Sequence, residues 1–313
     1  MPSRRAHRAS RRTPRQVPIR ATSPAEAGGE TGPIALHQRP TLEKAEMIPS
    51  TPETATRAFF SFPKVTDPAR HRDYNAWHQL DHRPENLALP GVVYGDRWVR
   101  TPACERLGSY PDLALAGSQY MAMYWFAEPT ADSIPEWKDL GDRAIHQGRR
   151  PELAWTERPM TRMFRPVQGH VAPRASVTLA ALPFRPHRGV HVEVSRVETS
   201  LHPDVADLSQ FEHETQVPDL LARDGVAGVW TFRSAPSRSN PDGPVVRIRL
   251  TYLEADPVEF TRALAVDPLP APPAALASTA TPLLTGPLAT ITPWEWDWFD
   301  EPAAAATDSG AGA

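Results

Sequence analysis

The sequence has one cysteine, Cys104, among 313 residues. A single thiol excludes an internal disulfide framework and any zinc or iron–sulfur site built on several thiolates of one chain. No apolar run approaches the roughly 18 residues that a membrane-spanning helix requires, and the sequence has no Walker-type phosphate loop, dinucleotide fingerprint or nucleophile elbow. Because the net charge is only −3, we expect neither sequence-specific nucleic-acid binding nor membrane attachment.

Proline, in contrast, is abundant, and many of the 36 prolines lie towards the two ends of the chain. Residues 1–55 form an Arg- and Pro-rich leader without the apolar core of a signal peptide. We expect this leader to be disordered and the protein to be cytoplasmic, with a transit peptide or a weak nucleic-acid arm as alternatives. Residues 268–290 have the composition of a linker, and residues 301–313 that of a disordered tail.

Residues 291–300 are rich in tryptophan. Trp294, Trp296 and Trp298 alternate with acidic residues, and a period of two places their indoles on one face of a strand. This pattern predicts an edge strand that docks on the domain, or an arm that reaches a partner.

The chain also contains an internal repeat. Residues 211–232 align without a gap with residues 77–98, at an offset of 134. The repeat keeps a proline, Pro84 and Pro218, and a downstream Gly-Val pair, but it does not keep the histidines of the first copy. Such a pattern indicates two copies of one structural unit.

The flanks of the two copies predict the same order of elements: strand, helix, strand, strand, helix and a last short strand. This is the order of a ferredoxin-like β-α-β-β-α-β unit, which leaves one sheet face uncovered. We therefore predict an α+β fold in which two such units, residues 56–170 and 186–267, pack sheet to sheet as a monomeric pseudo-dimer or a homodimer. The expected strands are 57–65, 118–129, 189–197 and 245–257, the later helices are 131–147 and 257–266, and the last strand lies near 161–167 or within 291–300.

A short motif supports this fold by resemblance. It combines an aromatic-rich helix, a His-x-Pro near the helix end, a Leu-Pro-Gly-Val turn and an aromatic strand. The motif resembles the EthD-like branch of the dimeric α+β barrel superfamily, over residues 57–167 and more weakly over 189–265. The resemblance implies an intrachain dimeric α+β barrel. It is carried by Trp77, His82, Pro84, Leu89, Pro90, Gly91, Val92 and Trp98.

The histidines of the motif, His78 and His82, are four residues apart and share a helix face. A metal site is one interpretation, but no third ligand can be selected and Pro84 should end or bend the helix near His82. The second interpretation makes His82 an acid–base residue, with the neighbouring Asp81 orienting its ring. In the third, His82 caps the helix end and His78 faces solvent.

The leading hypothesis is a barrel that binds a small hydrophobic or aromatic molecule without a cofactor or metal. Members of the superfamily include monooxygenases, cyclases, lactone isomerases and heme enzymes, so the resemblance implies a cofactor-independent cyclase, isomerase or monooxygenase. The alternatives are a non-catalytic scaffold and a heme-binding barrel, with His146 and His170 as the candidate iron ligands. The expected ligand pocket is lined by Trp77, Tyr94, Trp98, Tyr120 and Tyr124.

Overall fold

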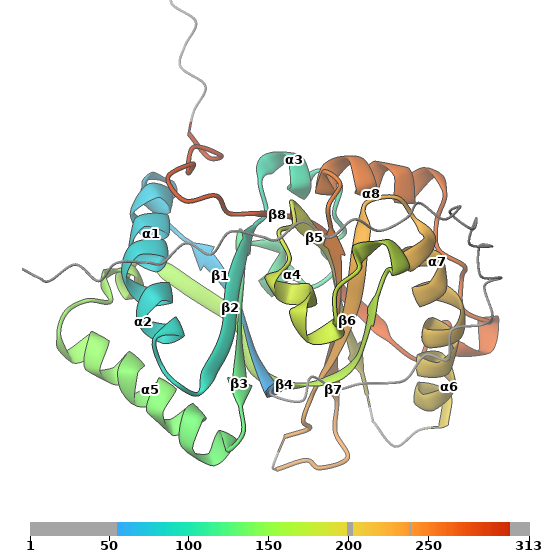
Figure 1. Ribbon diagram of the computed structural model, residues 1–313, viewed down its shortest axis with the longest axis horizontal. Coiled ribbons are helices and arrows are strands. Elements are labelled where there is room, and N and C mark those ends of the chain that lie inside the picture. The colour runs from blue at the N-terminus through green and yellow to red at the C-terminus, as the bar shows by residue number, and fades with distance from the viewer. Residues whose placement is uncertain (1–54, 199–202, 238, 301–313) are drawn as a thin grey trace, which may run out of the picture. The chain divides into compact units, whose positions relative to one another are not determined.

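A computed structural model describes residues 55–198, 203–237 and 239–300, all within one compact unit that spans Met47–Ala313. The leader predicted for residues 1–55, apart from Ala55, and the tail predicted for residues 301–313 lie outside the described residues. The described part is a mixed α+β fold around a closed, antiparallel, eight-stranded barrel (Figure 1).

The strands follow one another around the barrel in the order β1-β3-β2-β8-β5-β7-β6-β4. Most are rich in β-branched and aromatic residues, which favour a pleated surface that is buried on at least one face. Their bounds are β1 Ala55–Val65, β2 Val92–Val99, β3 Tyr120–Ala127, β4 Thr156–Val171, β5 Gly189–Val197, β6 Val226–Ser234, β7 Val245–Leu253 and β8 Thr281–Thr290.

The two halves of the chain contribute four strands each, in matching order. The first half runs β4-β1-β3-β2 across the sheet, and the second half runs β8-β5-β7-β6. Two seams join the halves: β4 pairs with β6 over its second half, from Phe164 to Val171, whereas β2 and β8 meet only at their ends, through Trp98–Thr290 and Val99–Ala289.

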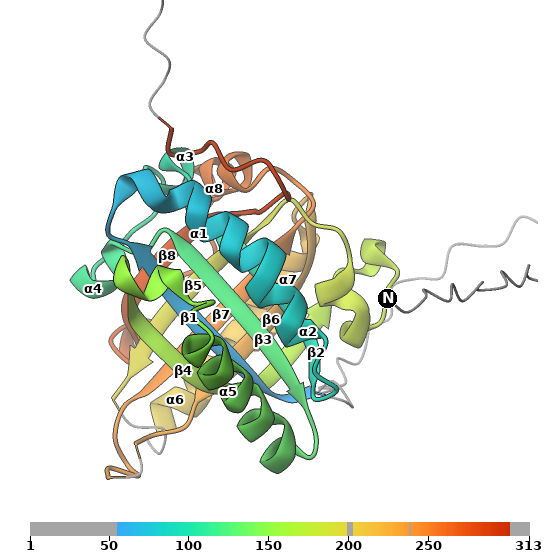
Figure 2. The ribbon, with the colours of Figure 1, turned by 90° about the vertical axis from the view of Figure 1, so that its left-hand side faces the viewer.

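Helices α1, α2 and α5 lie on one side of the barrel and α6 and α7 on the opposite side, whereas α3 of the first half lies beside α8 of the second (Figure 1). Helices α1 and α5 cross the outer face of the first-half strands (Figure 2). The helical bounds are α1 His71–Trp77, α2 Arg83–Leu87, α3 Pro102–Glu105, α4 Leu113–Ala116, α5 Thr130–His146, α6 Pro203–Phe211, α7 Val217–Ala222 and α8 Pro257–Val266. Short 3-10 turns lie at Pro68–Arg70, Pro151–Ala154, Pro173–Ala175, Leu179–Phe184 and Ala274–Leu276.

Alternate residues of each strand point into the barrel and out towards the helices. On β3, Met123 and Trp125 point inward into a core that both halves share. Trp125 meets Trp230 of β6 edge to face, with 5.2 Å between ring centroids. Each such fully buried side chain stabilises the fold by about 1.5–3 kcal/mol.

A π-helical turn interrupts the first long helix of each half at the aligned positions. His78–His82 joins α1 to α2, and Glu212–Gln216 joins α6 to α7. In each turn the backbone N–H of the next residue reaches back five residues, from Arg83 to His78 and from Val217 to Glu212. Pro84 was predicted to end or bend the helix near His82; the helix does not end there but continues to Leu87, because the wider turn leaves room for the proline.

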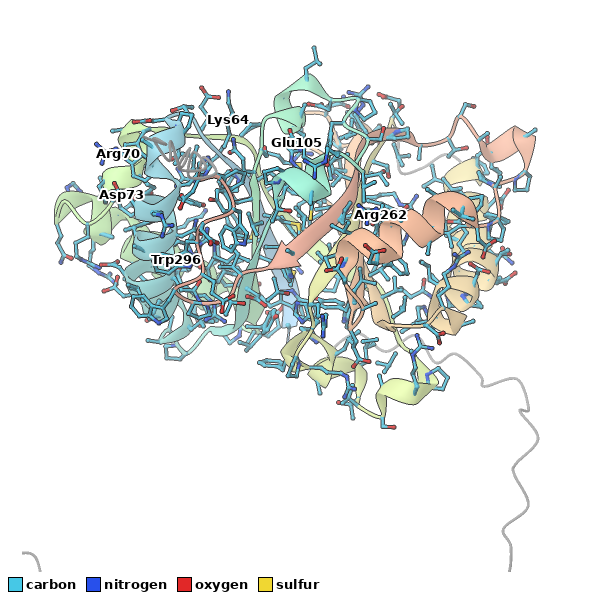
Figure 3. The ribbon with its side chains drawn as sticks, turned by 90° about the horizontal axis from the view of Figure 1, so that it is seen from above. Lys64, Arg70, Asp73, Glu105, Arg262 and Trp296 are labelled. Atoms are coloured by element: carbon cyan, nitrogen blue, oxygen red, sulfur yellow. The ribbon has the colours of Figure 1, made fainter. Side chains whose placement is uncertain are left out.

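Two predictions for the C-terminal region were also wrong. Residues 281–290, predicted as linker, form β8, which pairs with β5 over nearly its whole length and closes the barrel. Residues 291–300 contain no strand, and their indoles do not share a face: Trp294 is exposed whereas Trp296 is buried. The segment docks beside α1 through Trp296 (Figure 3), in a cluster with Tyr74 and Trp77.

Candidate functional site

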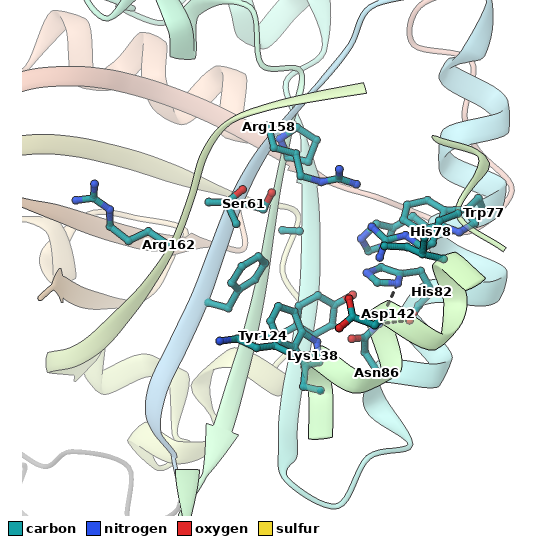
Figure 4. Close-up of a pocket in the computed structure, with 18 of the residues that line it drawn as sticks. Ser61, Trp77, His78, His82, Asn86, Tyr124, Lys138, Asp142, Arg158 and Arg162 are labelled. Carbon is teal, nitrogen blue, oxygen red and sulfur yellow. Dashed lines mark hydrogen bonds between the residues drawn. The ribbon is translucent and has the colours of Figure 1, made fainter. Parts of the chain in front are cut away.

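A cavity of about 510 Å³ lies in the first half, between the outer face of the sheet and the helices that cover it. Its floor comes from β1, β3 and β4, and its walls from α1, the π turn, α2 and α5 (Figure 4). This volume is typical of small-molecule sites. The lining residues are Phe59, Ser61, Pro63, Tyr74, Trp77, His78, His82, Asn86, Ala122, Tyr124, Trp137, Lys138, Gly141, Asp142, Ile145, Arg150, Arg158, Thr161, Arg162 and Met163.

One wall of the cavity is a row of side chains spaced four residues apart: Tyr74, His78, His82 and Asn86. A regular α-helix turns slightly past one face at every fourth residue, whereas a π turn has a larger repeat and keeps such a row aligned. The π turn therefore brings both histidines and Asn86 to the same cavity.

Two contacts hold the His82 ring. It stacks on the indole of Trp77, with 4.7 Å between centroids and an interplanar angle of 18°. The Asn86 amide donates to the backbone carbonyl of His82, which fixes the amide orientation, and the same Nδ2 lies 3.2 Å from His82 Nδ1. Nδ1 is therefore assigned as an acceptor, and the proton of the neutral ring sits on Nε2. Nε2 has no hydrogen-bond partner among the described residues.

Both histidines are neutral at physiological pH. Burial lowers the pKa of His82 well below 6.5, and the positive charges of Arg150 and Arg158 lower it further. Burial, followed by the charge of Arg97, lowers the pKa of His78 in the same way. A neutral imidazole with a proton on Nε2 can donate a hydrogen bond to a ligand oxygen.

The helix-cap interpretation predicted that His78 faces solvent, and this prediction was wrong. The His78 side chain is buried, lines the cavity and leaves Nδ1 without a partner among the described residues. That interpretation assumed a helix that ends near His82, whereas the helix continues to Leu87 and both histidines line the cavity.

Asp81 lies away from the His82 ring. Its carboxylate accepts from Arg149, with Nη1 3.0 Å from Oδ1, and Glu85 shares the same guanidinium at 2.7 Å. Adjacent helical residues point in different directions, so the pairing of Asp81 with His82 was wrong. Asn86, four residues on, contacts the ring instead.

The structure divides the five aromatic residues predicted to line the pocket. Trp77 and Tyr124 line the cavity. Tyr94 and Trp98 point into the barrel core, because alternate β2 residues face opposite sides of the sheet. Tyr120 shares the outer face with Tyr124 but lies further along the strand, where its hydroxyl bonds His71 and Asn75. The pocket prediction was therefore wrong for three of the five.

Sequence reasoning missed the basic side chains of the site. Arg150 and Arg158 line the cavity from segments outside the repeat. Arg97 lies on the helix-facing side of β2, fully buried between the rings of Tyr74 and Tyr120, with its guanidinium carbon 4.9 and 5.1 Å from the two centroids. The alternation of β2 could have identified Arg97, because it occupies a position that faces the helix rather than solvent.

Other sites considered from the sequence find little support. No group of three or more His, Cys, Asp or Glu residues within the described ranges could hold a metal ion. His146 is exposed at the end of α5. His170 pairs with His213 at 3.2 Å, beside a cavity of about 60 Å³ that has room for a few waters at most. Across the same ranges, no helix is long and apolar enough to cross a membrane.

Comparison with known proteins gives likenesses of fold only. No protein-family model matches the chain, and no curated protein matches it. A candidate chlorite dismutase is 13% identical, with a TM-score of 0.43, and the match covers 79% of this chain and 98% of that one. A candidate monooxygenase of Fusobacterium nucleatum is 7% identical at a TM-score of 0.43, covering 76% and 94%. The dye-decolorizing protein of V. cholerae is 13% identical at 0.39, covering 76% and 95%. Similarity this low does not select an activity.

Proposed function

We propose that the barrel is a tandem pair of ferredoxin-like units of the EthD-like type, and that the second unit extends to Thr290. The matching strand orders of the two halves support this proposal. The two π turns at aligned positions support it independently, because π turns are rare and a shared one at the same place suggests a common origin.

The first unit, on this proposal, binds a small, flat, aromatic molecule in the cavity under α1, α2 and α5. The observation that carries the proposal is the placement of His82 in the wall of a cavity of about 510 Å³ whose lining includes several aromatic side chains. The stacked pair of Trp77 and His82 forms one flat wall. Phe59 and Trp137, with centroids 4.7 Å apart, supply further aromatic surface.

His82 is the proposed acid–base residue. Its Nε2–H can donate a hydrogen bond to the carbonyl oxygen of the ligand, which stabilises the enolate that forms when a water molecule removes the proton from the acidic C–H of the ligand. Asn86 keeps Nδ1 as an acceptor and so keeps the donor on the opposite nitrogen. Enolisation of this kind is a step shared by cofactor-independent cyclisation, isomerisation and oxygenation, and these three reaction types remain the candidates.

The test uses anthrone, a three-ring ketone that enolises, under nitrogen. Exchange of its methylene protons in D2O, followed by NMR, measures proton transfer without requiring knowledge of the natural product. The informative variant is His82→Gln. Glutamine is the residue at the aligned position of the second half, Gln216. We expect wild type to accelerate exchange at least about 100-fold over this variant.

His146→Gln is the matched control, because His146 is an exposed histidine outside the cavity. It should exchange anthrone at the wild-type rate. Equal rates for wild type and His82→Gln would reject the acid–base role. Absence of any anthrone binding, together with no co-purified small molecule in native mass spectrometry, would reject the cavity as a ligand site and favour the scaffold alternative.

A further inference from the structure

The cavity of the first half is surrounded by more positive than negative charge. Four basic side chains line it and Arg97 lies directly behind its wall, whereas Asp142 is the one acidic side chain among the lining residues. Arg162 extends away from the two histidines, while Arg158 reaches towards the side of the cavity where Trp77 and His78 lie (Figure 4).

Arg150 and Arg158 share a single carboxylate. Glu152 is completely buried, and its Oε1 accepts from Arg150 Nε at 2.7 Å and from Arg158 Nη2 at 3.0 Å. One negative charge cannot neutralise two guanidinium groups. The remaining N–H donors of both arginines have no hydrogen-bond partner among the described residues, although Arg150 also lies over the Trp77 ring, 5.0 Å from its centroid.

Arg97 adds a second uncompensated charge. Its side chain is 1% exposed, and none of its three guanidinium nitrogens has a hydrogen-bond partner among the described residues. The nearby carboxylate of Asp96 accepts hydrogen bonds from the Tyr94 hydroxyl and from the backbone N–H of Arg97 instead. A buried cation without a partner is costly, and a nearby anion would offset that cost.

Two neutral polar groups of lining residues, one in the floor and one in the wall, also lack partners in the described part of the chain. They are the hydroxyl of Tyr124 and Nδ1 of His78, on side chains 2% and 3% exposed. Buried polar groups in folded proteins nearly always have a partner. Together with the unpaired guanidinium groups, they indicate a site built for a polar, negatively charged group.

We propose that the ligand of this cavity is an aromatic carboxylate. Its carboxylate would be held by Arg158 and Arg150, in the field of Arg97, with the ring system beside Trp77, His82 and Tyr124. A planar guanidinium matches a carboxylate with two parallel hydrogen bonds. This inference rests on the proposed function, because it names the class of molecule that the same cavity binds.

The test compares anthracene-9-carboxylate with 9-anthracenemethanol and the methyl ester of the acid, which keep the ring system but carry no charge. Quenching of protein tryptophan fluorescence reports binding, since Trp77 and Trp137 line the cavity. We expect wild type to bind the carboxylate at least about tenfold more tightly than either neutral compound. Arg158→Gln should reduce that preference to about twofold or less.

Arg262→Gln is the matched control, because it removes one exposed positive charge on α8 that pairs with Glu259. It should keep the full preference. If Arg158→Gln does not fold, as judged by circular dichroism, Arg150→Gln is measured in its place, with the same expectation.

Equal binding of all three compounds by wild type would overturn the inference and leave the proposed function intact. Binding of none of them would overturn the proposed function and the inference together. A preference that survives both arginine substitutions would overturn the placement of the carboxylate.

Discussion

The two halves of the barrel share a backbone arrangement but fill the space between helix and sheet differently. In the second half, Glu212 pairs with Arg247, and Glu193 pairs with Arg249, so each cation has its own carboxylate. Gln216, at the position aligned with His82, also accepts from Arg249 at 2.8 Å. The corresponding positions of the first half carry smaller or neutral side chains. The cavity between helix and sheet is therefore larger in the first half, about 510 Å³, than in the second half, about 270 Å³.

The same register explains the contrast residue by residue. Ser61 pairs across the sheet with Ala122, and at the aligned place Glu193 pairs with Arg249. The small pair leaves the floor of the first half open, whereas the charged pair fills more of the space in the second half. The comparison indicates that the second half fills this space with charge pairs, whereas the first half leaves the cavity that we propose as the binding site.

The largest effect should follow from breaking a charge pair of the second half. Glu193→Gln removes the carboxylate that pairs with the buried Arg249, which then keeps its hydrogen bond to the neutral Gln216. We expect a loss of about 3 kcal/mol in the free energy of unfolding, because a buried charge loses its counterion. Urea denaturation followed by circular dichroism measures it. Ser61→Ala, at the aligned position, should change stability by less than about 0.5 kcal/mol, and equal losses for both would refute the contrast.

Closing the space over β2 should have the next largest effect. A Cβ at Gly95 would lie 2.4 Å from the Tyr124 ring, whereas the second half already carries Val229 at the aligned position. Gly95→Ala should cost about 2 kcal/mol through overpacking and weaken binding of 9-anthracenemethanol. Gly141→Ala in α5, where the added Cβ meets nothing closer than 3.8 Å, should instead stabilise by about 0.5–1 kcal/mol. Similar effects from both alanines would show that steric crowding at Gly95 does not shape the site.

Removing the unpaired cation should stabilise the protein. Arg97→Met replaces a buried guanidinium that has no carboxylate partner among the described residues, and we expect a gain of about 1–2 kcal/mol in thermal or urea unfolding. The same variant should bind anthracene-9-carboxylate more weakly. Arg247→Met is the contrasting variant, because it leaves the carboxylate of Glu212 without its cation and should therefore destabilise the protein. Destabilisation of similar size by both would mean that Arg97 is compensated within the fold.

The smallest effect concerns acid sensitivity. His78 has a folded-state pKa well below the ordinary 6.5, so the unfolded chain takes up its proton first as the pH falls. Stability from this group is therefore complete above pH 6.5 and decreases below it, by about 1 kcal/mol at pH 5.5. His78→Gln should remove that part of the loss between pH 7.5 and 5.5, measured by urea midpoints. The exposed His146→Gln should retain the full loss, and an unchanged pH profile in His78→Gln would contradict a buried neutral imidazole.

Much of the architecture could be predicted from local pattern. Strand β5 and helix α8 begin and end at the predicted residues, because strong β-branched alternation and a Pro-initiated helix leave little ambiguity. Strand β8 was missed because its proline-rich sequence has weak local propensity and is held by pairing with β5, its neighbour in the barrel. The π turns were missed because a helix containing a proline is indistinguishable, in sequence, from one that ends there.

The sequence alone determined that the first copy of the repeat carries His82 where the second copy carries Gln216. It also determined the element order, since hydrophobic period and turn residues act locally. Only the tertiary structure decided which side chains join His82. Neighbouring residues of a strand lie on opposite faces of the sheet. Tyr94 and Trp98 of β2 therefore lie in the barrel core, whereas Arg97 between them lies on the face that carries the cavity. Arg150, Arg158 and Asn86 reach the same cavity from three different segments, and no local pattern encodes that convergence.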